Sequence, residues 1–348
     1  MRLLAYADLQ ATDGSERCFR GADTSLQQYR VSLFFEKLYT IYEENSCEGL
    51  IDLGDTTDDR SAIPVPVIDT VLAGLDRFPE NGLNYKIIGN HEQFLRDTSI
   101  DVSRLFSRHF TVVNRDVVAF GSTRVVFASY PANHDELTQW LAKQAAGPSP
   151  KLLFGHFQVV GARMNSGLAI MGIPREVLDR FRLSLLGHVH LPQTIGSRIH
   201  YVGSPFQQNW GEAGQAKRVA IVDTEALTVE WVPLEGFPVY RQADFATFTT
   251  QYSADSEDRW RVVLHSQDEA ERFYAMPEAA YCEPIHAYGA GTGKTGESDA
   301  LVPEVHDTAQ VLRSWMDARS PQEAGLDGIP ADDLLAVGKQ LVEGSEHT

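Results

Sequence analysis

The sequence has few cysteines and no long apolar run. Its three cysteines, Cys18, Cys47 and Cys282, are widely spaced and form no CxxC pair, so they predict no disulfide framework and fit a reducing compartment. No window approaches the run of about 18 apolar residues that a membrane helix needs. Asp8 stands where a signal peptide would still be apolar. We therefore expect a cytoplasmic protein that makes no membrane contact, in the host cytoplasm if the chain is viral.

An excess of positive charge is also missing. The formal net charge of −18 over 348 residues excludes a protein that coats nucleic acid with its whole surface. It does not exclude a local nucleic-acid site, because bound divalent metals reverse the field around them. The length is sufficient for a sizeable core and predicts two domains.

Short apolar runs that end in Gly, Asp, Asn or His recur along the first two thirds of the chain. They are LLAYAD, GLIDLGD, YKIIGNHE, VVFASYP, KLLFGHF, LSLLGHVH and IHYVGSP. Residues 25–44, 63–78 and 92–108 have helical spacing between the early runs. Alternating strands and helices predict an α/β layered sheet, with polar residues collected at the carboxyl ends of the strands.

Four parts follow from composition. Residues 1–235 form the strand-rich domain, and PLEGFP at 233–238 resembles a hinge. Residues 236–288 predict a small α/β domain, with a strand in RWRVVLHS and a helix in DEAERF. Residues 289–300 are a Gly-rich linker, and 301–348 an acidic tail with a helix at 332–341. GTGKT in the linker is not a P-loop, because Tyr288 occupies the first glycine position of that motif and no buried strand precedes it.

Five segments place metal-ligand residue types directly after an apolar run. They contain Asp8 and Gln10, Asp55, Asn90 and His91, His156, and His188 and His190. Each segment alone is more simply explained as a turn or a structural histidine, but turns do not account for all five at one sheet edge. Two divalent ions held a few ångströms apart can clamp a phosphate ester, with Asp55 as the candidate bridging ligand. His, Asp and Asn suit Mn, Fe or Zn, and Mg less well. We expect the glycine before each ligand to make the sharp turn.

The order Asp8, GDTTDD, GNHE, GH, GHVH resembles the calcineurin-like metallophosphoesterases over residues 1 to about 210. The resemblance implies a two-sheet α/β sandwich flanked by helices. It also implies one metal at Asp8, Gln10, Asp55 and His190, and a second at Asp55, Asn90, His156 and His188. His91 would be the general acid, oriented by Asp58, with Arg60 nearby.

Residues 199–223, which follow GHVH, are similar to the SbcD-type DNA repair nucleases and their bacteriophage counterparts. This resemblance continues to about residue 285. It implies a small capping domain that positions DNA, a homodimer, and an SbcC-type coiled-coil ATPase as partner. The expected activity is that of a Mn-dependent DNA nuclease, a 3′-to-5′ exonuclease and single-strand endonuclease. Phe206 and Trp210 either stack on an unpaired base or cover the sheet edge.

Gln10 departs from the family pattern, which has histidine there. An amide oxygen is a weaker donor than imidazole, so a looser first metal site is expected. Alternatively, Gln10 makes no metal contact and the site has fewer ligands. Two rival functions stay open: a phosphodiesterase or phosphatase for small molecules or phosphoproteins, and a DNA-end-binding scaffold with a weakened site.

Overall fold

The computed structural model describes residues 1–14, 25–80, 82–94, 101–147, 151–164 and 170–288. Residues 1–288 form one compact unit. The predicted linker, the acidic tail and its helix lie outside the described residues, and the boundary between residues 235 and 236 stays a prediction. No helix of the described part is long and apolar enough to cross a membrane.

The first sheet has six strands in the order β12-β11-β1-β2-β3-β4. They are β1 (Arg2–Tyr6), β2 (Gly49–Asp52), β3 (Tyr85–Ile87), β4 (Thr111–Val113), β11 (Lys217–Asp223) and β12 (Thr228–Leu234). Strands β1 to β4 are parallel, and β11 joins β1 in antiparallel orientation. Strands β1, β2 and β3 are almost entirely buried, as expected for strands covered on both faces, whereas the edge strand β4 is partly exposed.

The second sheet also has six strands, in the order β5-β6-β7-β8-β10-β9. They are β5 (Arg115–Phe120), β6 (Thr123–Ala128), β7 (Lys151–His156), β8 (Leu183–Gly187), β9 (Gln193–Ile195) and β10 (Ile199–Tyr201). Leu3, Ala5 and Ile51 of the first sheet share a buried core with Phe127 and Phe154 of the second. The two sheets therefore pack face to face.

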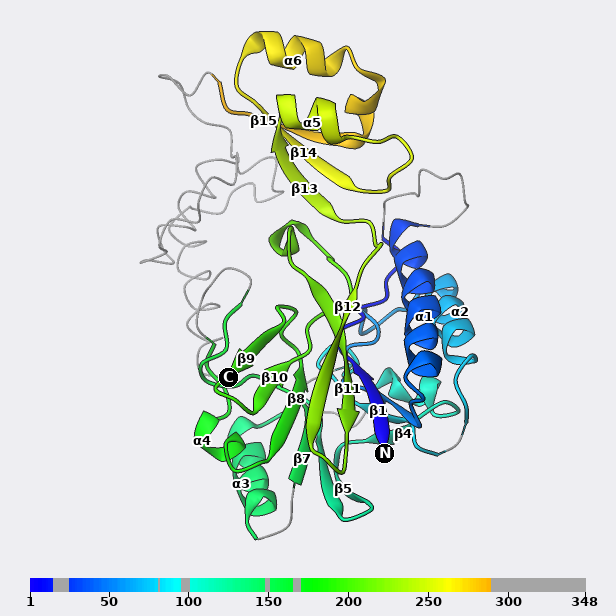
Figure 1. Ribbon diagram of the computed structural model, residues 1–348, viewed down its shortest axis with the longest axis vertical. Helices are drawn as coiled ribbons and strands as arrows, with labels where there is room; N and C mark the ends of the chain where they lie inside the picture. Colours follow the sequence, from blue (N-terminus) through cyan, green and yellow to red (C-terminus); the bar gives the residue numbers. More distant parts are fainter. Residues whose placement is uncertain (15–24, 81, 95–100, 148–150, 165–169, 289–348) are drawn as a thin grey trace, which may run out of the picture. The chain divides into compact units, whose positions relative to one another are not determined.

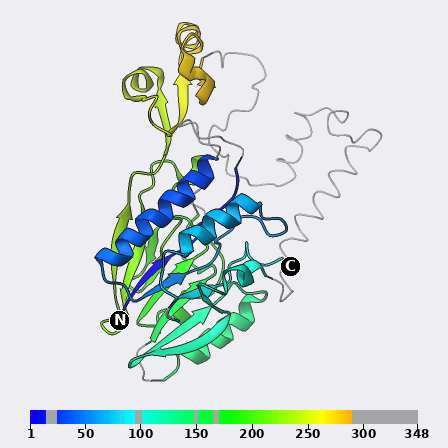
Figure 2. The same ribbon diagram turned by 90° about the vertical axis from the view of Figure 1, so that its right-hand side faces the viewer.

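Helices cover the outer face of each sheet (Figures 1 and 2). Helices α1 (Leu26–Glu44) and α2 (Val65–Leu75) bury Phe34, Phe35 and Val71 against the first sheet. Helices α3 (His134–Ala145) and α4 (Arg175–Leu178) bury Leu137 and Leu178 against the second. The predicted two-sheet α/β sandwich flanked by helices is confirmed.

The predicted helix over residues 92–108 is wrong. Gln93 forms an antiparallel bridge with Asp101, and Val102 N–H donates to the carbonyl of Glu92. These contacts bring residues 92 and 93 next to residues 101 and 102, which a continuous helix over 92–108 would keep apart. Only the short 3₁₀ helix η1 (Val102–Phe106) forms in the described part of this stretch.

A third, smaller sheet contains β13 (Tyr240–Asp244), β14 (Arg259–Leu264) and β15 (Cys282–His286), all parallel. Helices α5 (Phe245–Gln251) and α6 (Gln267–Tyr274) and the 3₁₀ helix η3 (Pro277–Tyr281) accompany it. Phe248, Trp260 and Phe273 form its separate core. The strand predicted in RWRVVLHS and the helix predicted in DEAERF are confirmed.

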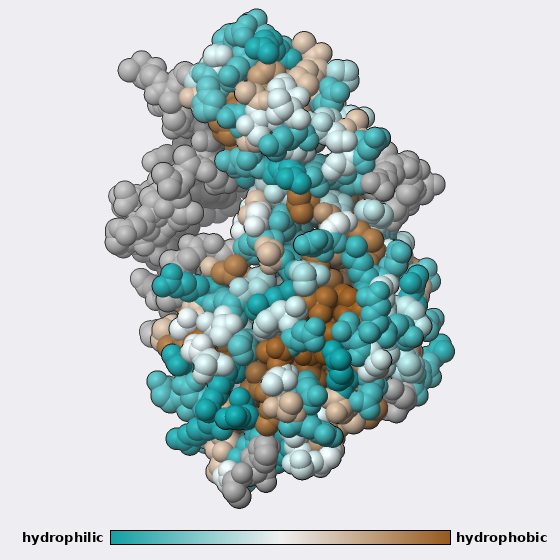
Figure 3. All heavy atoms as spheres, viewed as in Figure 1, coloured by the Kyte–Doolittle hydropathy of each residue, from teal (hydrophilic) through white to brown (hydrophobic). Residues whose placement is uncertain are grey.

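Hydrophilic side chains cover most of the face seen in Figure 3. Hydrophobic side chains gather at its centre, where β11 and β12 lie in Figure 1. Apolar atoms make up much of the accessible surface of any folded protein.

Candidate metal centre

The predicted ligand residues collect where parallel strands end. Asp8 follows β1, Asp55 follows β2, Asn90 and His91 follow β3, His156 ends β7, and His188 and His190 follow β8. The carboxyl ends of parallel strands meet at one edge of a sheet, and the two sheets face each other. Side chains from distant segments therefore meet at this common edge.

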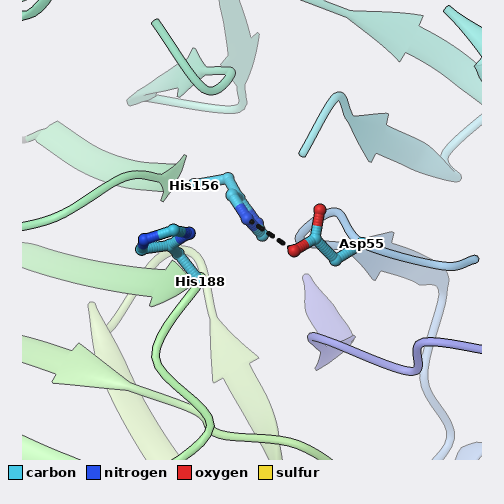
Figure 4. Close-up of side chains that lie close together, drawn as sticks. All are labelled: Asp55, His156 and His188. Atoms are coloured by element: carbon cyan, nitrogen blue, oxygen red, sulfur yellow. Dashed lines mark ion pairs between the residues drawn. The ribbon is translucent and has the colours of Figure 1, made fainter. Parts of the chain in front are cut away.

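The ligand atoms of Asp55, His156 and His188 lie within 4.8 Å of one another (Figure 4). Nε2 of His156 is 3.3 Å from Oδ2 of Asp55 and 3.2 Å from Oδ1 of Asn90. The same Asn90 oxygen is 2.7 Å from Nδ1 of His188. The structure thus brings together all four residues assigned to the second metal.

The local electrostatics suit a cation at this point. Burial lowers the pKa of His156, but the charge and hydrogen bond of Asp55 outweigh it and raise the pKa to about 9. Burial and the charge of His156 lower the pKa of His188 to about 3, so that imidazole is neutral. Nδ1 of His156 donates to the carbonyl of Leu53 at 2.6 Å, which turns Nε2 toward Asp55. A divalent cation would supply the positive charge that the His156 proton supplies here.

Asp8 offers a second indication of a metal. Its Oδ1 accepts a hydrogen bond from the backbone N–H of His188 at 2.8 Å. Its Oδ2 is buried with no hydrogen-bond partner among the described residues. Burial raises the pKa of Asp8 to about 6. A buried carboxylate oxygen without a donor is costly unless a cation binds it, so Asp8 fits the role assigned to it at the first metal.

Gln10 lies at the same edge. Its backbone N–H donates to the carbonyl of Asp55 at 2.8 Å. Its side chain is partly exposed and makes no hydrogen bond to a described residue. Whether Gln10 binds the first metal stays a prediction.

Several ligand residues themselves adopt the left-handed conformation that favours glycine. The φ angles are 54° for Asp8, 44° for Gln10, 57° for Asp55 and 88° for His188. We expected the glycine before each ligand to make the turn, and Gly54 does, with a φ of 96°. The expectation is wrong for Gly89, Gly155 and Gly187, which are not left-handed. Gly89 serves differently, because a Cβ there would overlap Oδ1 of Asp55. Such strain costs of order 1–3 kcal/mol at each residue and gathers at functional sites.

His91 lies beside the metal ligands. Its backbone N–H donates to Oδ1 of Asp55 at 2.8 Å. Its Nδ1 is 2.7 Å from the carbonyl oxygen of Asp58 and 3.2 Å from Oδ1 of the same residue. The hydrogen bond to Asp58 raises the pKa of His91 to about 9. Arg60 is exposed and makes no hydrogen bond or ion pair with His91.

Sequence reasoning missed a buried charge cluster beneath the site. Nζ of Lys86 lies 3.1 Å from Asp52 and 3.0 Å from Glu92, and all three side chains are fully buried. Glu92 also accepts the backbone N–H groups of Asp55 and Thr56. It therefore fixes the loop that carries Asp55. The available signal was a lysine inside an apolar strand, next to a motif glutamate.

Glu212 was missed as well. It ends the 3₁₀ helix η2 (Trp210–Glu212), and its Oε1 accepts a hydrogen bond from Nδ1 of His190 at 2.8 Å. Burial raises the pKa of Glu212, but the hydrogen bond from His190 and the charge of Lys217 outweigh it and lower the pKa to about 2. Nothing in the spacing of the metal motifs points to this residue.

The two aromatic candidates for base stacking have other roles. Phe206 is 1% exposed and stacks on Phe237 in the core, so it covers the sheet and cannot reach a base. Trp210 packs edge-on against Tyr240, with ring centroids 4.8 Å apart, and the guanidinium of Arg261 lies 4.2 Å from its centroid.

Aspartate, asparagine and histidine donors at the common strand edge suit a site of one or two divalent metals of the kind that phosphatases and nucleases use. No family model matches the sequence. A protein of Invertebrate iridescent virus 3, provisionally named as a phosphoesterase, is 24% identical over 189 residues. The match covers 52% of this chain and 54% of that protein, so the chain spans about half the length of the curated relative it matches.

Two solved structures show low similarity. An archaeal phosphodiesterase is 12% identical, with a TM-score of 0.36 over 67% of this chain and 100% of that chain. A dimetal phosphatase from Danio rerio is 13% identical, with a TM-score of 0.38 over 68% of this chain and 99% of that chain. The chain is thus similar over about half its length to a viral protein named as a phosphoesterase, and its Asp55, His156 and His188 cluster could hold a divalent metal.

Proposed function

We propose that this protein is a metal-dependent phosphodiesterase that cleaves DNA, with Mn²⁺ as its preferred ion. The observation that carries the chemistry is the convergence of Asp55, Asn90, His156 and His188, with His91 beside them. We assign to it 3′-to-5′ exonuclease and single-strand endonuclease activity.

The residues divide the chemistry between them. Two cations held by the ligands named above would supply Lewis-acid stabilisation of the phosphate ester and water of lowered pKa. Oδ1 of Asp55 accepts a hydrogen bond from the backbone N–H of His91, and this contact keeps His91 beside the proposed metal ligands. His91 is protonated at neutral pH because of Asp58, so it can deliver a proton to the leaving oxygen. Nδ1 is engaged with Asp58, which leaves Nε2 for the substrate.

Two features support DNA as the substrate. Residues 199–223 resemble the corresponding stretch of SbcD-type nucleases, and a small α/β sheet follows them, as in those proteins.

The net charge of −18 opposes DNA binding by the chain alone. We therefore expect weak, salt-sensitive DNA affinity that improves with a coiled-coil ATPase partner and with a second copy of this chain.

The alternative function is hydrolysis of small phosphate esters. Phe206 is buried and cannot stack on a base, and the Trp210 ring already contacts Tyr240 and Arg261. The loss of one stacking candidate weakens the argument for a nucleic-acid strand over a small ester.

Substrate comparison tests these proposals. Purified protein with Mn²⁺ is incubated with plasmid and hairpin DNA, and separately with p-nitrophenyl phosphate and cyclic nucleotides. We expect DNA cleavage, with Asp55→Ala abolishing it and His91→Ala reducing it by about 10²–10⁴-fold. His265→Ala, which changes an exposed histidine far along the chain, is the control and should cleave normally.

Turnover of the small esters alone would show that the DNA assignment is wrong. DNA affinity without Mn²⁺ binding or cleavage would instead favour the end-binding scaffold.

A further inference from the structure

The segment between β10 and β11, residues 202–216, contains a carboxylate with an unusual environment. Glu212 is 0% exposed, although it lies in a three-residue 3₁₀ helix of a connecting segment. A buried carboxylate is costly unless it is fully paired. Its partners therefore indicate what it does.

The two carboxylate oxygens of Glu212 have separate partners. Oε1 accepts the hydrogen bond from Nδ1 of His190 at 2.8 Å. Oε2 accepts from Nζ of Lys217 at 2.7 Å, from Oγ of Ser204 at 3.0 Å and from the backbone N–H of Gln208 at 3.2 Å. The donors on Oε2 prevent the carboxylate from rotating, so Oε1 holds His190 in one orientation.

This contact also decides which nitrogen of His190 is free. Because a carboxylate only accepts, Nδ1 of His190 carries a hydrogen, so in the neutral imidazole Nε2 is the nitrogen with the lone pair that a metal would bind. His156 is oriented the same way, but by the neutral carbonyl of Leu53. An anionic partner makes an imidazole a stronger donor than a neutral one does.

The same segment, residues 202–216, also contacts Asp8, another residue assigned to the first metal. The side-chain amide of Gln208 donates to the carbonyl of Asp8 at 2.7 Å and to that of Leu9 at 3.3 Å. Asp8 and His190 are both assigned to that metal, and Gln10, the other residue assigned to it alone, can offer only a neutral amide oxygen.

We propose that Glu212 is a positioning residue for the first metal, and that its charge strengthens His190 as a ligand and compensates for the weak donor at Gln10. The inference rests on the proposed metal-dependent function. Glu212, which is not itself a proposed ligand, would thus offset the weak donor at Gln10.

Calorimetric titration of the metal-free full chain with Mn²⁺ tests the inference without an activity assay. We expect the wild type to bind two ions unequally. Glu212→Gln should weaken one of the two sites by about 10–100-fold and leave the other unchanged. Gln10→His should tighten the same site, and in that background Glu212→Gln should cost less.

Two further variants separate positioning from folding. Ser204→Ala removes one donor from Oε2 but keeps the contact between Glu212 and His190, so its Mn²⁺ affinities should match the wild type. Glu212→Gln combined with Lys217→Met removes both buried charges, and the selective loss at one site should persist. Circular dichroism confirms that each variant is folded.

Two unchanged Mn²⁺ affinities in folded Glu212→Gln, or equal weakening of both sites, would overturn the role of Glu212 while leaving the metal-dependent function intact. A wild type that binds no Mn²⁺ would instead contradict the proposed function itself.

Discussion

At the scale of single residues, Asp58 favours the protonated form of His91, the proposed general acid. The hydrogen bond to Asp58 raises the pKa of His91 to about 9, so the proton is present below that pH and is lost as pH rises through it. Asp58→Asn removes the charge but keeps the backbone carbonyl that contacts Nδ1. We expect the alkaline limb of the kcat/KM profile to move to lower pH, with activity at pH 6 largely retained.

Asp59→Asn is the matched control, because Asp59 is an exposed neighbour. Its pH profile should coincide with that of the wild type. If Asp58→Asn lowers activity equally at every pH, Asp58 shapes the loop and does not set the protonation of His91.

The convergence of the proposed ligand residues could be predicted from sequence because each follows an apolar run, and parallel strands bring such positions to one edge. Their backbone conformations could not. Left-handed φ angles at Asp8 and His188 are imposed by contacts with segments far away in the chain, such as the hydrogen bond between the two residues. Glu212 was not predictable for the same reason, since its pairing with His190 depends on tertiary structure.

At the scale of elements, β3 is tied to the site by a buried lysine. Burial lowers the pKa of Lys86, but the charges of Asp52 and Glu92 outweigh it and raise the pKa above its ordinary value. Lys86→Met would leave both carboxylates buried without a cation. We expect the free energy of unfolding to fall by about 3–5 kcal/mol, measured by chemical denaturation.

Lys143→Met on α3 is the control, because Lys143 is exposed. It should change the free energy of unfolding by no more than about 0.5 kcal/mol. Equal stability of Lys86→Met and the wild type would show that the ion pairs of Lys86 with Asp52 and Glu92 do not stabilise the fold.

The same scale explains where sequence reasoning failed. Helix α1 was predicted well, because its apolar face and its capping box, formed by Ser25 and Gln28, are local signals. The stretch 92–108 has comparable spacing, but Glu92 is drawn inward to the backbone of Asp55 and Thr56. These hydrogen-bond donors lie in the loop after β2, so the sequence around Glu92 does not reveal the contact.

At the scale of the whole described unit, Trp210 connects residues 202–216, the segment between β10 and β11, to the small sheet of β13, β14 and β15. Its Nε1 donates to Oε1 of Glu283 at 3.1 Å, and its ring contacts Tyr240 and Arg261. Trp210 is two residues from Glu212, which holds His190. Displacement of the small sheet would therefore be transmitted to a proposed metal ligand.

Hydrogen exchange measured by mass spectrometry tests this link in Trp210→Ala. We expect faster exchange in residues 202–216 and in β14 and β15, because the substitution removes the indole that contacts Arg261 of β14 and Glu283 of β15. Trp231→Ala is the matched control. Trp231 lies on β12 against Arg218 and His200, and its loss should leave exchange in the small sheet unchanged. Faster exchange confined to residues 202–216 would show that the small sheet is held by other contacts, such as the one between Arg30 and Pro238, and that Trp210 does not couple it to the metal centre.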